Sequence, residues 1–152
     1  MFRVVMFVVR KPGTTPENFR NHYERVHIPL MRKLGGELFP ISHSRRYIAR
    51  ANDVTQDGSE MYPAVTISGV PSDFSYDAIT EMTFESRQSF YDFSERLAEP
   101  EIAAKVAEDC AAFLDTSRTP SIAVIGELHE TKRENVNGSL GQEKTPGNRD
   151  QQ

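Results

Sequence analysis

Two histidines and one tyrosine lie together in the segment Thr15–Leu30, and imidazole and phenol are groups that transfer protons. Tyr23 and His27 are four residues apart, so a helix places them one turn apart on the same side. His22 precedes His27 by five residues, and regular α-helical geometry makes two such side chains diverge by about 140°. We therefore predict an acid–base site at Tyr23 and His27, with His22 at the opposite edge of the helix.

The helix that carries these residues is predicted from Pro16 to about Leu34. Pro16 suits the first helical position, because its missing N–H has no partner there in any helix. An apolar stripe at helical spacing consists of Phe19, Tyr23, Val26, Leu30 and Leu34. Pro29 removes a hydrogen bond to the Arg25 carbonyl, which predicts a kink near Arg25. The competing interpretation of His27 is a structural partner of a backbone group freed by that kink.

A second set of candidates lies on the strand predicted for Ile41–Arg50. Residues of alternating parity face opposite sides of a sheet, with His43, Arg45 and Tyr47 on one side and Ser44, Arg46 and Ile48 on the other. His43 and Tyr47 are candidates for a cavity wall, and an exposed edge position is the competing interpretation for His43. Arg46 or Arg45 is the candidate for a bidentate contact to a substrate carboxylate.

The strand predicted for Tyr76–Phe84 places Asp77 and Glu81 on one face and Phe84 on the other. Glu81 beside a histidine would raise the pKa of that histidine. The competing interpretation of both acids is an ion pair with one of the arginines.

Aromatic side chains are available to line an apolar slot for a planar ligand, and the candidates for this role are Phe19, Tyr23, Phe84, Phe90 and Phe93. Phe90 lies on the helix predicted for Glu85–Leu97. His129 lies near the end of the strand predicted for Ser121–Thr131. It is a candidate ligand contact, with a solvated position as the competing interpretation.

No spacing in the chain indicates a metal or a bound cofactor. Two-histidine metal sites on a helix use i, i+3 or i, i+4 spacing, which His22 and His27 do not match. There is no glycine-rich phosphate loop. Cys110 falls on an apolar face of the helix predicted for Pro100–Leu114, where a buried thiol is inert. We therefore expect no metal and no cofactor.

The totals favour one cytoplasmic domain. The chain has 152 residues, of which 38% are hydrophobic, so it can bury a core. The net charge of −4 argues against a nucleic-acid partner, and the apolar runs are too short to span a membrane. The single cysteine excludes an internal disulfide.

The order of predicted elements is β-α-β-β-α-β, with the second helix broken in two, which is typical of an α+β ferredoxin-like fold. The domain is expected to span residues 1–131, with an insertion at about residues 52–73 and a polar tail at 132–152. A short extra strand is expected within the insertion, at Tyr62–Val70. A four-stranded sheet with helices on one face leaves its other face bare. Because the first and last strands are apolar, we expect a homodimer closed through the sheet faces.

Several motifs resemble the EthD family of the dimeric α/β-barrel superfamily. In order, they are Arg10-Lys11-Pro12-Gly13, Pro16-Glu17-Asn18-Phe19, His22-Tyr23, His27-Ile28-Pro29-Leu30, Tyr76–Phe84, Phe113-Leu114-Asp115 and Gly126-Glu127-Leu128-His129. The insertion and the polar tail are similar to those of longer fungal members found with aromatic polyketide pathways. The resemblance implies a dimeric barrel and a small aromatic substrate.

This resemblance implies a cofactor-independent lyase of secondary metabolism, most simply a decarboxylase of an anthraquinone-type carboxylic acid. His27 would supply the proton that the ring carbon needs before CO2 departs. One alternative is a polyketide cyclase or isomerase, in which the same histidine acts as the base of an aldol step. Another is a small-molecule binding protein without catalytic activity.

Overall fold

The structure is a computed structural model that describes residues 1–133, apart from the side chain of Glu60. Of the polar tail predicted for residues 132–152, all but Lys132 and Arg133 lies outside the described residues. No helix within residues 1–133 is both long enough and apolar enough to cross a bilayer.

A four-stranded antiparallel sheet forms one layer of the fold. Its strands are β1 (Phe2–Val8), β2 (Ser42–Tyr47), β5 (Ala78–Phe84) and β6 (Ser121–Ile125), arranged in the order β2-β5-β1-β6. All pairs are antiparallel, and Val4 faces Met82 of β5 on one side and Val124 of β6 on the other. This arrangement confirms the predicted α+β ferredoxin-like fold.

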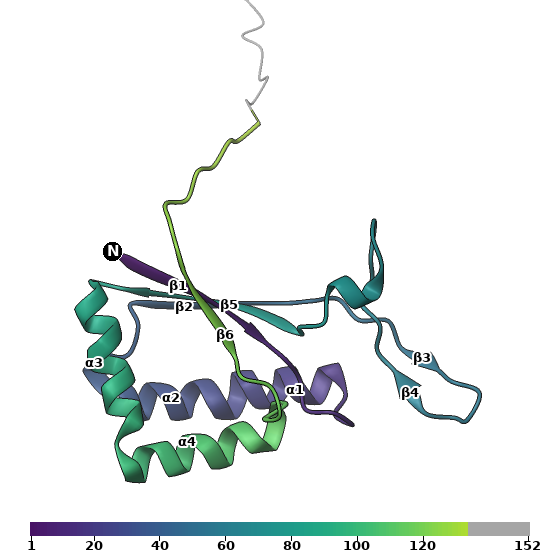
Figure 1. Ribbon diagram of the computed structural model, residues 1–152, viewed down its shortest axis with the longest axis horizontal. Coiled ribbons are helices and arrows are strands. Elements are labelled where there is room, and N and C mark those ends of the chain that lie inside the picture. Colours follow the sequence, from purple (N-terminus) through teal and green to yellow (C-terminus); the bar gives the residue numbers. More distant parts are fainter. Residues whose placement is uncertain (134–152) are drawn as a thin grey trace, which may run out of the picture.

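The helices form a second layer that covers one face of the sheet (Figure 1). The first helical segment comprises α1 (Pro16–His22), the π-helix η1 (Tyr23–His27), α2 (Ile28–Gly35) and the 3-10 turn η2 (Gly36–Leu38). The second comprises α3 (Arg87–Ala98) and α4 (Pro100–Phe113). Thr15 caps α1 through its hydroxyl, which accepts the Asn18 N–H. Gly36 ends α2 with a φ of 54°, a left-handed conformation that favours glycine.

A π-helix stands where the sequence predicts a kink. The Ile28 N–H bonds to the Tyr23 carbonyl, five residues back, so this turn contains one residue more than an α-helical turn. Pro29 follows immediately and has no N–H for the Arg25 carbonyl. The wider turn therefore lies where the proline interrupts the regular hydrogen-bond ladder.

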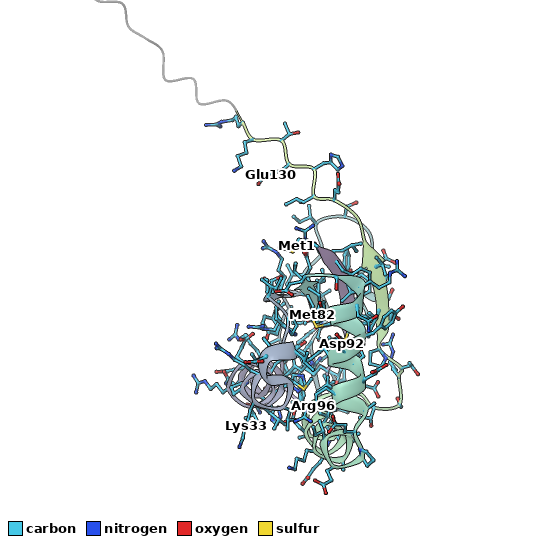
Figure 2. The ribbon with its side chains drawn as sticks, turned by 90° about the vertical axis from the view of Figure 1, so that its left-hand side faces the viewer. Met1, Lys33, Met82, Asp92, Arg96 and Glu130 are labelled. Atoms are coloured by element: carbon cyan, nitrogen blue, oxygen red, sulfur yellow. The ribbon has the colours of Figure 1, made fainter. Side chains whose placement is uncertain are left out.

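The insertion forms a two-stranded hairpin, β3 (Asp53–Val54) and β4 (Glu60–Met61), followed by the 3-10 turn η3 (Pro71–Asp73). The extra strand expected at 62–70 is absent from the described residues, apart from an isolated bridge between Arg50 and Ala64. Pro63, which cannot donate a ladder hydrogen bond, accounts for this difference. The last strand is also shorter than expected, and the chain after Ile125 runs away from the folded body, as Glu130 in Figure 2 shows.

Two hydrophobic clusters fill the space between sheet and helices. The Tyr23 cluster contains Val8, Phe19, Tyr23, Ala78 and Phe113. The Phe84 cluster contains Val4, Met82, Phe84 and Phe93. Gly35 permits close packing at the second cluster, because a Cβ there would lie 2.7 Å from Phe93 Cε2.

Candidate active site

The structure brings both helix histidines to one carboxylate. His27 Nδ1 lies 2.6 Å from Asp109 Oδ2, and His22 Nε2 lies 2.8 Å from Asp109 Oδ1. The Asp109 side chain, on α4, is 7% exposed. An ionised carboxylate only accepts hydrogen bonds, so both imidazoles donate to it. The three side chains form a row from the partly exposed ring of His22 to the buried ring of His27.

The expected divergence of His22 and His27 is wrong, and the π-helix explains why. In an α-helix, positions five apart differ by about 140°. The segment between these residues is η1, whose extra residue brings the fifth position back to the starting side. His22 also stacks on Phe113, with ring centroids 4.7 Å apart, which fixes its ring beside Asp109.

A cavity of about 390 Å³ lies against His27. This volume is in the range of pockets that bind small molecules. Much of the lining is apolar, and the aliphatic and phenylalanine residues in it come from β1 and the residue after it, α2, α4 and the start of the α4–β6 loop: Met6, Phe7, Val8, Val9, Met31, Val106, Phe113 and Leu114. His27 and Tyr23 also line it, and their exposed fractions are only 8% and 1%. The predicted apolar slot beside the imidazole is therefore present in the structure.

Burial sets the protonation state of His27. Desolvation lowers the pKa of this imidazole below 6.5, and the hydrogen bond to Asp109 opposes that shift without reversing it. The neutral ring carries its proton on Nδ1, where it meets the carboxylate, so Nε2 holds a free lone pair. Among the described residues, Nε2 has no hydrogen-bond partner. The ring can therefore accept a proton from a ligand in the cavity.

Tyr23 stands edge-on to His27, with ring centroids 5.2 Å apart. Its hydroxyl lies 2.9 Å from Thr80 Oγ1 on β5, and both residues are buried. Burial raises the pKa of Tyr23 to about 12, so the phenol stays protonated at neutral pH. Cys110 lines the same cavity, and burial raises the pKa of its thiol to about 11, which keeps it protonated and unreactive.

His43 and Tyr47 share the helix-facing side of β2, as their parity predicts, but neither lines the cavity beside His27. Tyr47 donates to Glu24 Oε1 at 2.5 Å, and Arg45 binds both oxygens of Glu24 at 2.7 and 2.9 Å. Arg45 Nη1 also donates to His43 Nδ1 at 2.8 Å. Burial and the Arg45 charge lower the pKa of His43 to about 4. Arg45 is thus already engaged in an ion pair.

Arg46 and Glu81 lie on the open face of the sheet, opposite the helices. Arg46 pairs in register with Ile79, which in turn faces Phe7, and Glu81 stands between Ser44 and Val5. Within one chain, the sheet separates both side chains from His27. The ion pair preferred for Asp77 is present, with Arg10 Nε at 3.3 Å and Arg50 Nε at 3.2 Å.

The aromatic residues predicted to line one slot lie in different parts of the structure. Phe84 belongs to the Phe84 cluster and Phe90 packs against it, and neither residue lines the cavity. Phe19 packs on Tyr23 and Phe113 behind the cavity wall. His129 is exposed and follows β6 in the segment that leaves the folded body (Figure 1).

Asp109 is the main residue that sequence reasoning missed. It is three residues after Val106 and four before Phe113, so it shares the inner face of α4 with them. An acid on the apolar face of a helix is the signal that could have found it. The described residues contain no group of three or more His, Cys, Asp or Glu side chains that could hold a metal ion.

Comparison with known proteins shows the family to which this chain belongs. The family model of the EthD domain matches residues 11–117. The chain belongs to the EthD family. The matched range contains η1, Asp109 and most of the cavity-lining side chains.

Among curated proteins, this EthD chain is similar to the dehydratase ustZ of Ustilaginoidea virens. The two are 30% identical over 114 residues, which covers 72% of each chain. The fold of this chain resembles that of an EthD family protein from Bacillus halodurans, with a TM-score of 0.47. The match covers 84% of this chain and all of the other, and the two are 17% identical. The fold also resembles that of a dimeric ferredoxin-like protein from Thermobifida fusca, with a TM-score of 0.43 and 13% identity over 83% and 90% of the two chains.

Proposed function

We propose that this protein is a cofactor-independent lyase that removes water from a planar, ring-containing carbonyl compound, such as an intermediate of aromatic polyketide biosynthesis. The observation that carries this proposal is the free Nε2 of His27 at the wall of an apolar cavity, with Asp109 on the other ring nitrogen. This is the arrangement of a general base whose cation is stabilised once it forms. The relative named a dehydratase supports the choice of reaction.

The residues of the cavity supply each proton transfer of such an elimination. His27 Nε2 removes a proton from the carbon next to a ketone, and the electron pair of that C–H bond forms an enolate. Asp109 stabilises the imidazolium. The Tyr23 phenol, which stays protonated, donates a hydrogen bond to the enolate oxygen. The enolate then expels a hydroxyl from the β carbon, which takes the proton from His27 and leaves as water.

Neither arginine that the sequence offers for orienting a substrate carboxylate beside His27 is placed to do so, and this favours dehydration over decarboxylation. The two candidates for holding a substrate carboxylate were Arg45 and Arg46. Arg45 already binds Glu24, and Arg46 lies across the sheet from the cavity. A decarboxylase is the second candidate, because an apolar lining favours the loss of a charged carboxylate. In that reaction, the imidazolium of His27 would protonate the ring carbon.

We also infer that a second copy of the chain covers the open face of the sheet. That face carries the apolar residues Val5, Phe7, Ile79, Ala123 and Ile125, and Phe7 is 38% exposed. Two such faces packed together would bury this surface. Light scattering on the purified protein is expected to give twice the mass of the chain, and a monomeric mass at micromolar concentration would contradict the dimer.

The reaction can be tested with a tetralone that carries a hydroxyl β to its ketone. Enzyme-dependent loss of one water gives a dienone that tautomerises to a fluorescent naphthol. His27→Ala is expected to lower the rate by at least about a hundredfold, because the base is lost. His129→Ala, which removes an exposed histidine outside the cavity, is the matched control and is expected to leave the rate unchanged.

Mass detection separates the alternatives. Loss of CO2 from an ortho-hydroxylated anthraquinone carboxylic acid would favour the decarboxylase, and ring closure of a poly-β-keto chain would favour the cyclase. Saturable binding with no turnover would favour a binding protein. A full rate in the His27→Ala variant would remove His27 from the mechanism and contradict the proposal.

A further inference from the structure

We propose that Arg118 selects the substrate by binding an anionic oxygen, a carboxylate or a phenolate, at the outer end of the cavity. This inference rests on the proposed function, because it assigns the substrate class of the same cavity: a planar aromatic compound with an anionic group remote from the reacting carbon. Arg118 lies on the loop between α4 and β6.

Arg118 supplies the guanidinium group among the residues that line the cavity. Among the described residues that line it, no other is an arginine or a lysine. The arginines considered for this role from the sequence are placed elsewhere, as described above for Arg45 and Arg46. Arg10 and Arg50 form ion pairs with Asp77, and neither lines the cavity.

The guanidinium of Arg118 has unused donors. Its Nη1 donates one long hydrogen bond, 3.5 Å, to the Ser75 carbonyl, and the described residues give it no ion pair. Four of its five N–H groups are therefore available to a ligand. Asp115 is the carboxylate among the residues that line the cavity with Arg118. Its Oδ1 already accepts hydrogen bonds from the Ser117 N–H at 3.1 Å and from the Ser117 hydroxyl at 2.6 Å.

The two polar ends of the cavity differ in depth. His27 is 8% exposed, so its ring marks the inner end, whereas Arg118 is exposed and marks the mouth. Apolar side chains of β1 and α4, such as Val8 and Phe113, lie along the cavity. A flat apolar ring would lie against them, with its carbon acid at the imidazole and its anionic oxygen at the guanidinium, where a bidentate contact adds orientation as well as affinity.

A matched pair of ligands tests this role. Naphthoic acid and naphthamide have the same ring system and differ in the charge of one group, and calorimetry measures the Kd of each. Arg118→Gln is expected to weaken binding of the acid about tenfold and to leave binding of the amide unchanged, because only the charged contact is lost. Arg118→Lys is expected to recover part of the affinity for the acid.

Arg46→Gln is the control, because it removes an arginine from the opposite face of the sheet and is expected to change neither Kd. Equal weakening of acid and amide by Arg118→Gln would indicate a structural effect and overturn the proposal. Unchanged binding of the acid, or no binding of either probe by the wild type, would also overturn it.

The His27→Ala variant separates this inference from the proposed function. It is expected to bind the acid normally, since the anion contact lies at the mouth. If Arg118→Gln behaves as expected and His27→Ala keeps full turnover, the anion site stands and the mechanism fails. If His27→Ala loses turnover and Arg118→Gln still binds the acid normally, the mechanism stands and this inference fails.

Discussion

The Tyr23 cluster and the Phe84 cluster are both built from aromatic and aliphatic side chains between the same sheet and the same helical layer, yet they differ in polarity. The polar or charged residues that are buried as whole residues in the described part of the chain are His27, Asp77 and Thr80, and the side chain of Asp109 is buried as well. Thr80 bonds to Tyr23, His27 stacks edge-on against it, and Asp77 adjoins Ala78 of the same cluster. The buried members of the Phe84 cluster are all apolar.

This difference separates two tasks within one core. An apolar cluster stabilises the fold through burial and close packing, as at Gly35 and Phe93. A cluster with buried polar groups gains less, because each group must be desolvated and paired. The Tyr23 cluster bears that cost next to a cavity, which is where shifted pKa values and catalysis are found together.

The largest expected effect is on activity, from Asp109→Asn. The amide cannot stabilise the imidazolium, so we expect a loss in kcat of about a hundredfold or more. The carboxylate raises the pKa of His27, so without it that pKa falls further, and the acidic limb of the kcat/KM profile shifts to lower pH. A pH profile of both proteins measures this shift.

Asp92→Asn is the control for that experiment. Asp92 is an acid on α3 that accepts a hydrogen bond from Gln88 Nε2 at 2.8 Å and takes no part in the cavity. It is expected to keep the wild-type profile. An unchanged profile in Asp109→Asn would show that the histidine–aspartate pair is not part of the reaction.

The next effect is on stability, from Phe84→Ala. Phe84 is 2% exposed in the apolar cluster, and removing such a ring costs about 3–5 kcal/mol. Urea unfolding measures the loss, while kcat and KM at low temperature are expected to stay unchanged. A rise in the KM of the folded variant would show that Phe84 contributes to substrate binding. It would contradict the separate roles assigned to the two clusters.

The smallest effect is a pH dependence of stability that arises at His43. Its folded pKa of about 4 lies below the unfolded value of 6.5, so the unfolded chain binds more protons between these values, and stability falls as pH falls through this window. His43→Gln is expected to flatten this decline by about 1–2 kcal/mol at the acidic end, measured as the Tm at several pH values.

His129→Gln, at an exposed position, is expected to reproduce the wild-type pH dependence. His43 stacks on Phe39, which packs against the Phe84 cluster, so His43→Gln is also expected to leave turnover unchanged. A loss of turnover would instead support the catalytic role that the sequence predicts for His43.

The fold follows from patterns that a single sequence displays. Strand alternation correctly places His43 and Tyr47 on the same side of β2, because the period of a strand is two, but it does not show that this side faces the helices. Helix capping by Thr15 and the glycine stop after α2 are equally local. These features require no knowledge of how distant segments pack.

The site is harder to predict because it depends on one irregular turn and on distant contacts. The relation between His22 and His27 reverses once a π-helix replaces an α-helix, and helical periodicity does not report that substitution. Asp109 reaches His27 across 82 positions of the chain. Residue type alone also does not indicate that Phe84 and Tyr23 pack in different clusters of the core.

The π-helix at Tyr23–His27 has a consequence for changes in chain length. Deleting one residue between His22 and His27 would let the segment close into a continuous α-helix, in which the two histidines, then four positions apart, differ in direction by only about 40°. Both imidazoles would then still lie on the side of the helix that faces Asp109. Relatives aligned by residue count alone would then pair non-equivalent histidines, so a spacing of four in one chain and five in another can describe the same site.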